Sequence, residues 1–156
     1  MTPMRIYLDT SVYNRPFDDQ QQPRIWLETM ALSVILQMIE SGDGVLVTSS
    51  VVAYETSKNP HAERRAWVRR ASALAGEFVN VNPAIRQRAI VLEGFGIKAL
   101  DALHVACAES VSIDFLLTCD DRLIRRYRQI GNTKMNVTDP VTFVREHNDQ
   151  EMETVQ

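Results

Sequence analysis

An apolar run meets an acid and two hydroxyl residues in the segment Ile6-Tyr7-Leu8-Asp9-Thr10-Ser11. We expect a short strand from Arg5 to Leu8, with Asp9 directly after its end. Two other apolar runs have the same form, because Val45–Thr48 ends in a pair of serines and Phe115–Thr118 is followed by acids. The pattern predicts short buried strands that end in polar residues.

Segments with helical periodicity separate these runs, after a polar loop over residues 9–22. We expect two weaker strands at Phe78–Val81 and Met135–Thr138. The expected helices are Pro23–Ser41, one that follows Ser49-Ser50 and carries Tyr54 and Glu55, Ala62–Leu74, Pro83–Glu93, Lys98–Glu109, Asp120–Ile130 and Val141–His147. Strands that alternate with helices predict an α/β fold of three layers, α/β/α, with a mostly parallel central sheet. Ligands of such folds gather at the carboxyl ends of the strands.

The chain has 156 residues, of which 45% are hydrophobic and 24% charged, as in an ordinary single domain. We expect one domain over residues 1–147 and an acidic tail over residues 148–156 that frays. Two cysteines do not make a disulfide scaffold, so Cys107 and Cys119 are expected to be reduced thiols. No apolar stretch approaches the roughly 20 residues of a membrane span, and Met1–Leu8 lacks the layout of a signal peptide. These features predict a cytoplasmic protein without a membrane partner.

The net charge of −3 gives no overall reason to expect nucleic-acid binding, but the charges are unevenly distributed. Between Lys58 and Arg88 there are seven Lys or Arg and two acids, and a second basic cluster covers residues 122–128. These clusters are either solvated helix faces or a surface that follows phosphates around an acidic centre. The candidate RNA-binding residues are Arg64, Arg65, Arg69, Arg122 and Arg126.

Four acids from four separate segments are expected at the carboxyl edge of the sheet: Asp9, Glu55, Asp101 and Asp120. Two carboxylates roughly 4 Å apart repel by about 4 kcal/mol at an effective dielectric constant of 20, so a cation is needed among them. All-oxygen ligands suit Mg²⁺ or Mn²⁺. One or two such ions can activate water for in-line attack at phosphorus, which is nuclease chemistry.

Three segments resemble the signature segments of PIN-domain ribonucleases, which include the VapC-type toxins. These are Tyr7-Leu8-Asp9-Thr10-Ser11-Val12, Leu100-Asp101-Ala102-Leu103-His104-Val105-Ala106 and Leu117-Thr118-Cys119-Asp120-Asp121-Arg122-Leu123. The loop Tyr13-Asn14-Arg15-Pro16-Phe17-Asp18-Asp19 is similar to a variant in one branch of that family. The resemblance extends from about Arg5 to Thr138.

The resemblance implies a single PIN-like nuclease domain and an Mg²⁺- or Mn²⁺-dependent endoribonuclease that prefers single-stranded RNA. Proteins of this kind are commonly homodimeric and often held inactive by a small antitoxin. It also implies that the four acids bind the metal, and that Thr118 and Ser11 orient an acid or a metal-bound water. Asp121 is an alternative to Asp120, although the spacing from Thr118 favours Asp120.

Each candidate also has a purely structural interpretation. Singly, the acids could cap turns and helices or be solvated. We expect His104 to be a packed histidine bonded to a local partner rather than a ligand, and Cys119 not to be catalytic. Trp26 and Trp67 are expected in the core or an interface rather than stacked on bases.

Two other catalytic or signalling classes fit less well. A receiver domain needs an acidic pair after its first strand, but Thr10 follows Asp9; it also needs a late lysine at a strand end, and Lys134 precedes its strand. A phosphatase with an aspartyl nucleophile would need a second Asp where Ser11 stands. The alternative that stays open is a catalytically inactive PIN-like module that binds nucleic acid or protein.

Overall fold

Five parallel strands form a single sheet in the computed structural model, which describes residues 3–155 and the side chains of residues 3–147. The strands are β1 (Met4–Leu8), β2 (Gly44–Ser49), β3 (Glu77–Val79), β4 (Phe115–Leu117) and β5 (Asn136–Thr138). Their order in the sheet is β3-β2-β1-β4-β5, and every pairing is parallel. The prediction of a mostly parallel sheet is confirmed.

Strand β1 is the centre of this sheet. Its residues Ile6, Tyr7 and Leu8 are fully buried, as expected for a strand covered on both faces. The chain runs from β1 to β2 and β3 on one side and then crosses over to β4 and β5 on the other. The order therefore reverses between β1 and β4, and their carboxyl ends border the crevice where open α/β sheets bind ligands.

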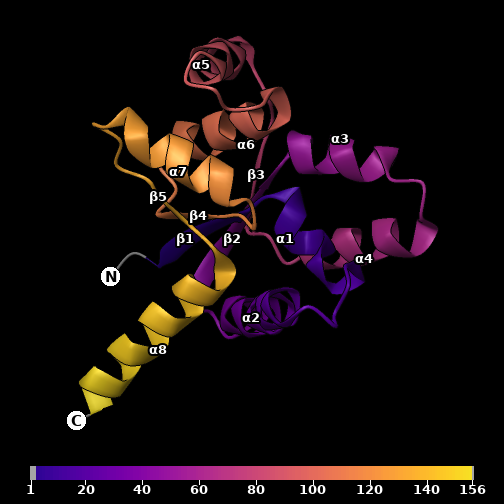
Figure 1. Cartoon of the computed structure of the whole chain (residues 1–156), viewed down its shortest axis with the longest axis vertical. Coiled ribbons are helices and arrows are strands. Elements are labelled where there is room, and N and C mark those ends of the chain that lie inside the picture. The colour runs from indigo at the N-terminus through magenta and orange to yellow at the C-terminus, as the bar shows by residue number, and fades with distance from the viewer. Residues whose placement is uncertain (1–2, 156) are drawn as a thin grey trace.

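Helices cover both faces of the sheet. They are α1 (Thr10–Asn14), α2 (Pro23–Glu40), α3 (Ser50–Lys58), α4 (Ala62–Ser72), α5 (Pro83–Glu93), α6 (Ala99–Ser110), α7 (Asp121–Ile130) and α8 (Pro140–Val155), with a 3₁₀ turn at Arg15–Phe17. In Figure 1, α2 and α8 lie below the sheet and α5, α6 and α7 lie above it. Helices α1, α3 and α4 gather at the right of the view. The core joins these layers through Leu32 of α2, Val105 of α6 and Phe143 of α8. The predicted three-layer α/β/α arrangement is confirmed.

The structure differs from the sequence pattern at two places. The expected loop over residues 9–22 contains α1, because Asp9 caps it by accepting a hydrogen bond from the Val12 amide, and Val12 and Tyr13 are buried. Helix α8 continues to Val155 rather than ending near His147, since no Gly or Pro interrupts the segment. The predicted fraying of segment 148–156 concerns side chains outside the described residues and stays a prediction.

Two further expectations concern the whole chain. None of the helices among the described residues is long and apolar enough to cross a membrane. Cys107 and Cys119 are both free thiols, as expected.

Candidate active site at the carboxyl edge of the sheet

The four predicted acids line one cavity of about 370 Å³ at the carboxyl ends of β1 and β4. The remaining lining residues are Thr10, Ser11, Asn14, Arg15, Asp18 and His104. The two strand ends are joined here, because the amide of Asp9 donates to the carbonyl of Leu117 at 3.2 Å. The structure thus brings acids from four segments together at this edge.

Asp9 is the most deeply buried of the four acids, with 3% of its surface exposed. Its Oδ1 accepts hydrogen bonds from the Ser11 hydroxyl at 2.5 Å and from the Val12 amide at 3.3 Å. Burial raises the pKa of Asp9, while the charge of His104 and the hydroxyls of Ser11 and Thr118 act in the opposite direction. The carboxylate is thus desolvated and held in one orientation.

Ser11 and Thr118 connect the loop after β1 to the loop after β4. Their hydroxyl oxygens are 3.5 Å apart. Ser11 Oγ accepts from the amide of Cys119 at 3.1 Å, and Thr118 Oγ1 accepts from the amide of Asp120 at 3.1 Å. The two hydroxyls named from the sequence therefore position the backbone that carries Asp120 as well as the carboxylate of Asp9.

Asp101 and Asp120 enter the cavity from the first turn of α6 and the N-cap of α7. Asp120 Oδ1 accepts from the amide of Arg122 at 2.9 Å, so this acid is also a helix cap. Burial raises the pKa of Asp101 to about 6, and the charges of Asp9, Asp120 and Glu55 add to the rise. The carboxylates are close enough to repel one another.

Glu55 reaches the cavity from α3. Its Oε1 accepts a hydrogen bond from the Thr10 hydroxyl at 2.9 Å and is in contact with Nε2 of His104. Burial alone would raise the pKa of Glu55, but the hydrogen bonds and the charge of His104 lower it below its ordinary value. Glu55 is the one acid of the four that is held by a histidine.

His104 is the packed histidine that the sequence indicated, with 1% of its surface exposed. Its Nδ1 lies 2.6 Å from the Tyr7 hydroxyl, which lies 2.6 Å from Ser49 Oγ. Because Ser49 Oγ accepts from the amides at the start of α3, its own proton goes to Tyr7. Tyr7 therefore links Ser49 to Nδ1 of His104, and Nε2 of the same ring contacts Glu55. Sequence reasoning missed this chain of polar contacts, whose members lie far apart in the sequence.

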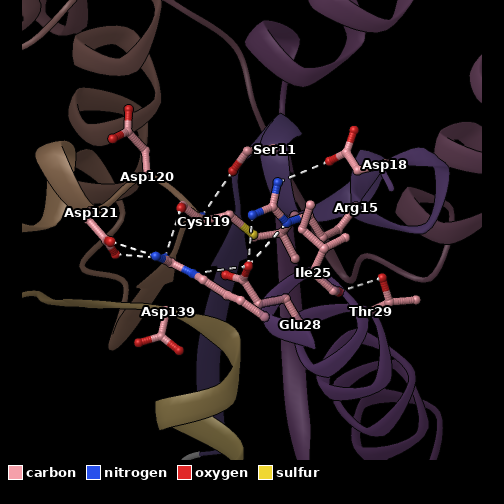
Figure 2. A network of polar contacts seen from close by, with 12 residues as sticks. Ser11, Arg15, Asp18, Ile25, Glu28, Thr29, Cys119, Asp120, Asp121 and Asp139 are labelled. Carbon is pink, nitrogen blue, oxygen red and sulfur yellow. Dashed lines mark hydrogen bonds and ion pairs between the residues drawn. The ribbon is translucent and has the colours of Figure 1, made fainter. Parts of the chain in front are cut away.

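A second polar network lies beside the cavity, and Figure 2 shows it. Glu28 of α2, 1% exposed, pairs with Arg15 at 2.8 Å and with Arg24 at 3.4 Å. Arg24 also binds both carboxylate oxygens of Asp121, at 2.6 and 2.7 Å. Sequence reasoning missed this network, although the four-residue spacing of Arg24 and Glu28 on one helix was a visible signal.

The same network separates the two candidate acids after β4. The Arg24 guanidinium lowers the pKa of Asp121 and occupies its carboxylate outside the cavity. Asp120 lines the cavity instead, and in Figure 2 its carboxylate points away from that of Asp121.

The basic residues named from the sequence fall into two groups. Arg122 and Arg126 line a small cavity that also includes Asp101 and Asp120, and Arg64 lines a groove that adjoins the acidic cavity. Arg65 instead donates to the carbonyl of Asn59 at 2.7 Å, and Arg69 is exposed on α4 and lines none of these cavities. Arg64, Arg122 and Arg126 therefore line hollows that share residues with the acidic cavity, whereas Arg65 and Arg69 line neither hollow.

The two tryptophans lie outside the acidic cavity. Trp67 is partly buried and donates from Nε1 to the carbonyl of Tyr13 at 2.7 Å. Trp26 is half-exposed on α2, so it is not part of the core, and its expected place in an interface stays a prediction. Neither residue lines the acidic cavity.

The acids present a donor set suited to a hard divalent cation. All four ligand candidates are carboxylates; burial raises the pKa of Asp101 most, and the charges of the other three acids add to the rise. As placed, no three His, Cys, Asp or Glu side chains within the described residues are gathered closely enough to hold an ion by themselves. Mg²⁺ commonly keeps several waters and uses one or two carboxylates together with substrate phosphate, so an open arrangement fits this ion.

Comparisons with known proteins found one family and a solved structure of similar fold. The family model of the PIN domain matches residues 6–129. None of the curated proteins matches the sequence. Among solved structures, the chain is similar to one in the crystal structure of VapBC2 from Rickettsia felis bound to a DNA fragment from their promoter. The two are 16% identical with a TM-score of 0.54, over 86% of this chain and 98% of that one, which is a likeness of fold.

PIN domains are generally metal-dependent nucleases. The family match covers most of β1, all elements from α1 to β4, nearly all of α7 and all four acids of the cavity, whereas β5 and α8 lie beyond it. The chain therefore belongs to the PIN domain family.

Proposed function

We propose that the protein is a metal-dependent endoribonuclease that hydrolyses phosphodiester bonds of single-stranded RNA, as the toxin of a toxin–antitoxin pair. The observation that carries the proposal is the meeting of Asp9, Glu55, Asp101 and Asp120 in one cavity at the switch between β1 and β4. Membership of the PIN domain family supports nuclease chemistry.

In this proposal the four carboxylates hold one or two Mg²⁺ or Mn²⁺ ions. A bound ion would supply Lewis-acid chemistry, which activates water and stabilises charge on the phosphate oxygens. The chain's own residues do the positioning. Ser11 and Thr118 hold Asp9 and the loop of Asp120, and His104 and Thr10 hold Glu55.

The surroundings of the cavity suit a phosphate-bearing strand. Arg122 and Arg126 lie beside Asp101 and Asp120, where they can bind phosphates on one side of the scissile bond. Arg126 packs against Gly96, whose φ is +88° and where an added Cβ would lie 2.1 Å from Arg126 Nη1. Glycine at this position therefore leaves room for the arginine near the acids.

The role as a toxin rests on the fold likeness to VapBC2 and on the sequence resemblance to VapC-type toxins. A toxin of this kind would work in the cytoplasm as a homodimer restrained by an antitoxin. An apolar stripe on α2 offers a surface for a protein partner, because Trp26, Leu27, Met30 and Val34 are all exposed.

A second candidate function is an inactive PIN-like module that binds nucleic acid or protein. It is favoured by one observation, that the described side chains as placed do not gather into a metal-ligating group. Direct measurement of Mn²⁺ binding by titration calorimetry separates the two candidates, because the inactive module would take up no ion at the acidic cavity.

The proposal is tested by cleavage of a labelled single-stranded RNA in Mg²⁺, with the same sequence annealed to its complement as the double-stranded comparison. We expect the wild type to cut the single strand faster, and Asp120→Asn to lose cleavage. The matched control is Asp121→Asn, which changes the neighbouring acid that Arg24 occupies. Equal activity of Asp120→Asn and wild type would contradict the assignment.

A further inference from the structure

A groove of about 540 Å³ adjoins the acidic cavity. It lies along α3 and the corner between α3 and α4, and it shares Thr10, Asn14 and Glu55 with the acidic cavity. The two hollows therefore adjoin, and an extended ligand that lies in the groove would reach the four acids. The size is within the range of about 300–1,000 Å³ of sites that hold small molecules.

An exposed aromatic ring lines this groove. Tyr54 directly precedes Glu55 on α3 and is 54% exposed, and the ammonium of Lys58 lies 5.5 Å from the centre of its ring. A flat aromatic face beside a cation is the pairing that single-stranded nucleic acids use, with a base on the ring and a phosphate on the cation.

A second cation on the same groove is also held against a ring. The guanidinium carbon of Arg64 lies 5.5 Å from the centre of the Phe17 ring. The corner between the helices is fixed as well, because Asn59 accepts from Arg65 Nη1 at 2.7 Å and from the amide of His61 at 2.9 Å. Groups fixed before binding lose less conformational entropy when a ligand arrives.

We propose that this groove binds the RNA strand next to the scissile phosphate, with a base stacked on Tyr54 and backbone phosphates on Lys58 and Arg64. The inference rests on the proposed nuclease function and adds the path of the substrate. Stacking on one ring tolerates any base, so the groove selects single strands with free bases rather than a sequence. An acidic peptide could use the cations but has no base to place on the ring.

The test compares Tyr54→Ala, Tyr54→Phe and Phe78→Ala with the wild type. Phe78 is the matched control, because it is equally exposed at 54% but lies on edge strand β3 outside the groove. Binding of a fluorescein-labelled single-stranded oligouridine is followed by anisotropy in EDTA, and cleavage of the same RNA is followed in Mg²⁺. We expect Tyr54→Ala to raise Kd and KM by about 5- to 150-fold, while Tyr54→Phe and Phe78→Ala stay near the wild type.

The cations are tested by the salt dependence of the same binding. Lys58→Ala should reduce the slope of log K against log salt concentration by about 1, whereas Arg70→Ala, an exposed arginine of α4 outside the groove, should leave it unchanged. If the slope is unchanged in Lys58→Ala, Lys58 does not bind a backbone phosphate and that part of the proposal is wrong.

Each remaining outcome decides between the proposals. If the wild type cleaves RNA and Tyr54→Ala matches it in Kd and KM, the groove is wrong and the nuclease function stands. If the wild type neither binds nor cleaves RNA, both fail. If Tyr54→Ala and Lys58→Ala lose affinity for a polyglutamate peptide but not for RNA, the groove is a protein-docking site and the inference is overturned.

Discussion

The imidazole of His104 contacts the Glu55 carboxylate through Nε2, and its Nδ1 lies 2.6 Å from the Tyr7 hydroxyl. Glu55 comes from α3 and His104 from α6, so the contact links these two helices at the acidic cavity. Tyr7 belongs to the central strand β1, so Glu55 is connected to the sheet through His104 and Tyr7. The orientation of Glu55 is thus determined by the core of the fold.

Removal of the His104 side chain should therefore lower activity without unfolding the protein. We expect His104→Ala to lose about 10- to 100-fold in kcat or in apparent Mn²⁺ affinity, the usual effect of losing a group that orients a ligand. Tyr7→Phe should lose less, and His104→Gln should recover part of the loss because its amide can donate to Glu55. Steady-state cleavage at several Mn²⁺ concentrations measures this, and wild-type values for His104→Ala would contradict it.

Arg15 should contribute more to stability than Arg24, although both pair with Glu28. Removing Arg15 takes two hydrogen bonds from the buried Glu28 and leaves it the longer 3.4 Å contact with Arg24. Breaking a buried ion pair by removing one partner destabilises by about 3–5 kcal/mol. Arg24 and its partner Asp121 are 52% and 55% exposed, and exposed pairs contribute only about 0–1 kcal/mol. Urea unfolding of Arg15→Ala and Arg24→Ala should show this difference, and equal losses would refute it.

The raised pKa of Asp101 predicts a pH dependence of stability in the metal-free protein. The folded state holds the proton up to about pH 6, whereas the unfolded chain releases it near 3.8. Folding therefore favours the protonated acid, and stability falls as pH rises from about 4 to 6. In EDTA, Asp101→Asn should match the wild type near pH 4 and have a higher Tm above pH 6. A wild-type advantage at pH 7 would contradict this sign.

Arg122 and Arg126 should bind RNA through charge. The double variant Arg122→Ala with Arg126→Ala is expected to weaken RNA binding and reduce the salt slope by about 2, one for each lost phosphate contact. Arg125→Ala is the control, because Arg125 lies on the same helix but does not line the cavity beside the acids. Anisotropy titrations from low to moderate salt measure the slopes. Equal slopes in the double variant and the wild type would exclude the contact.

Much of the fold was predictable because strands and helices alternate along the chain and the acids follow the strands directly. Asp9 and Asp120 could be placed at one edge from the rule that parallel strands end together. Helix α1 was missed because five residues are too few to show a helical period. The contact of His104 with Glu55 and the pairing of Arg24 with Asp121 join residues distant in sequence, so only the packed structure reveals them.

The roles of the basic residues were the least predictable part of the site. Arg64, Arg65 and Arg69 belong to one basic helix, and their spacing does not show which of them faces the acids. In the structure Arg64 lines the groove, while Arg65 is used to fix the corner at Asn59. A charge run thus predicts a basic surface but not which members contact a ligand.

The most direct test of the nuclease assignment is cleavage of a labelled single-stranded RNA by the wild type and by Asp101→Asn, each in Mg²⁺, in Mn²⁺ and in EDTA. We predict cleavage by the wild type with either ion, none in EDTA, and none by Asp101→Asn under any condition. Cleavage by the wild type that persists in EDTA, or full activity of Asp101→Asn with Mg²⁺, would contradict a metal-dependent site built on these four acids.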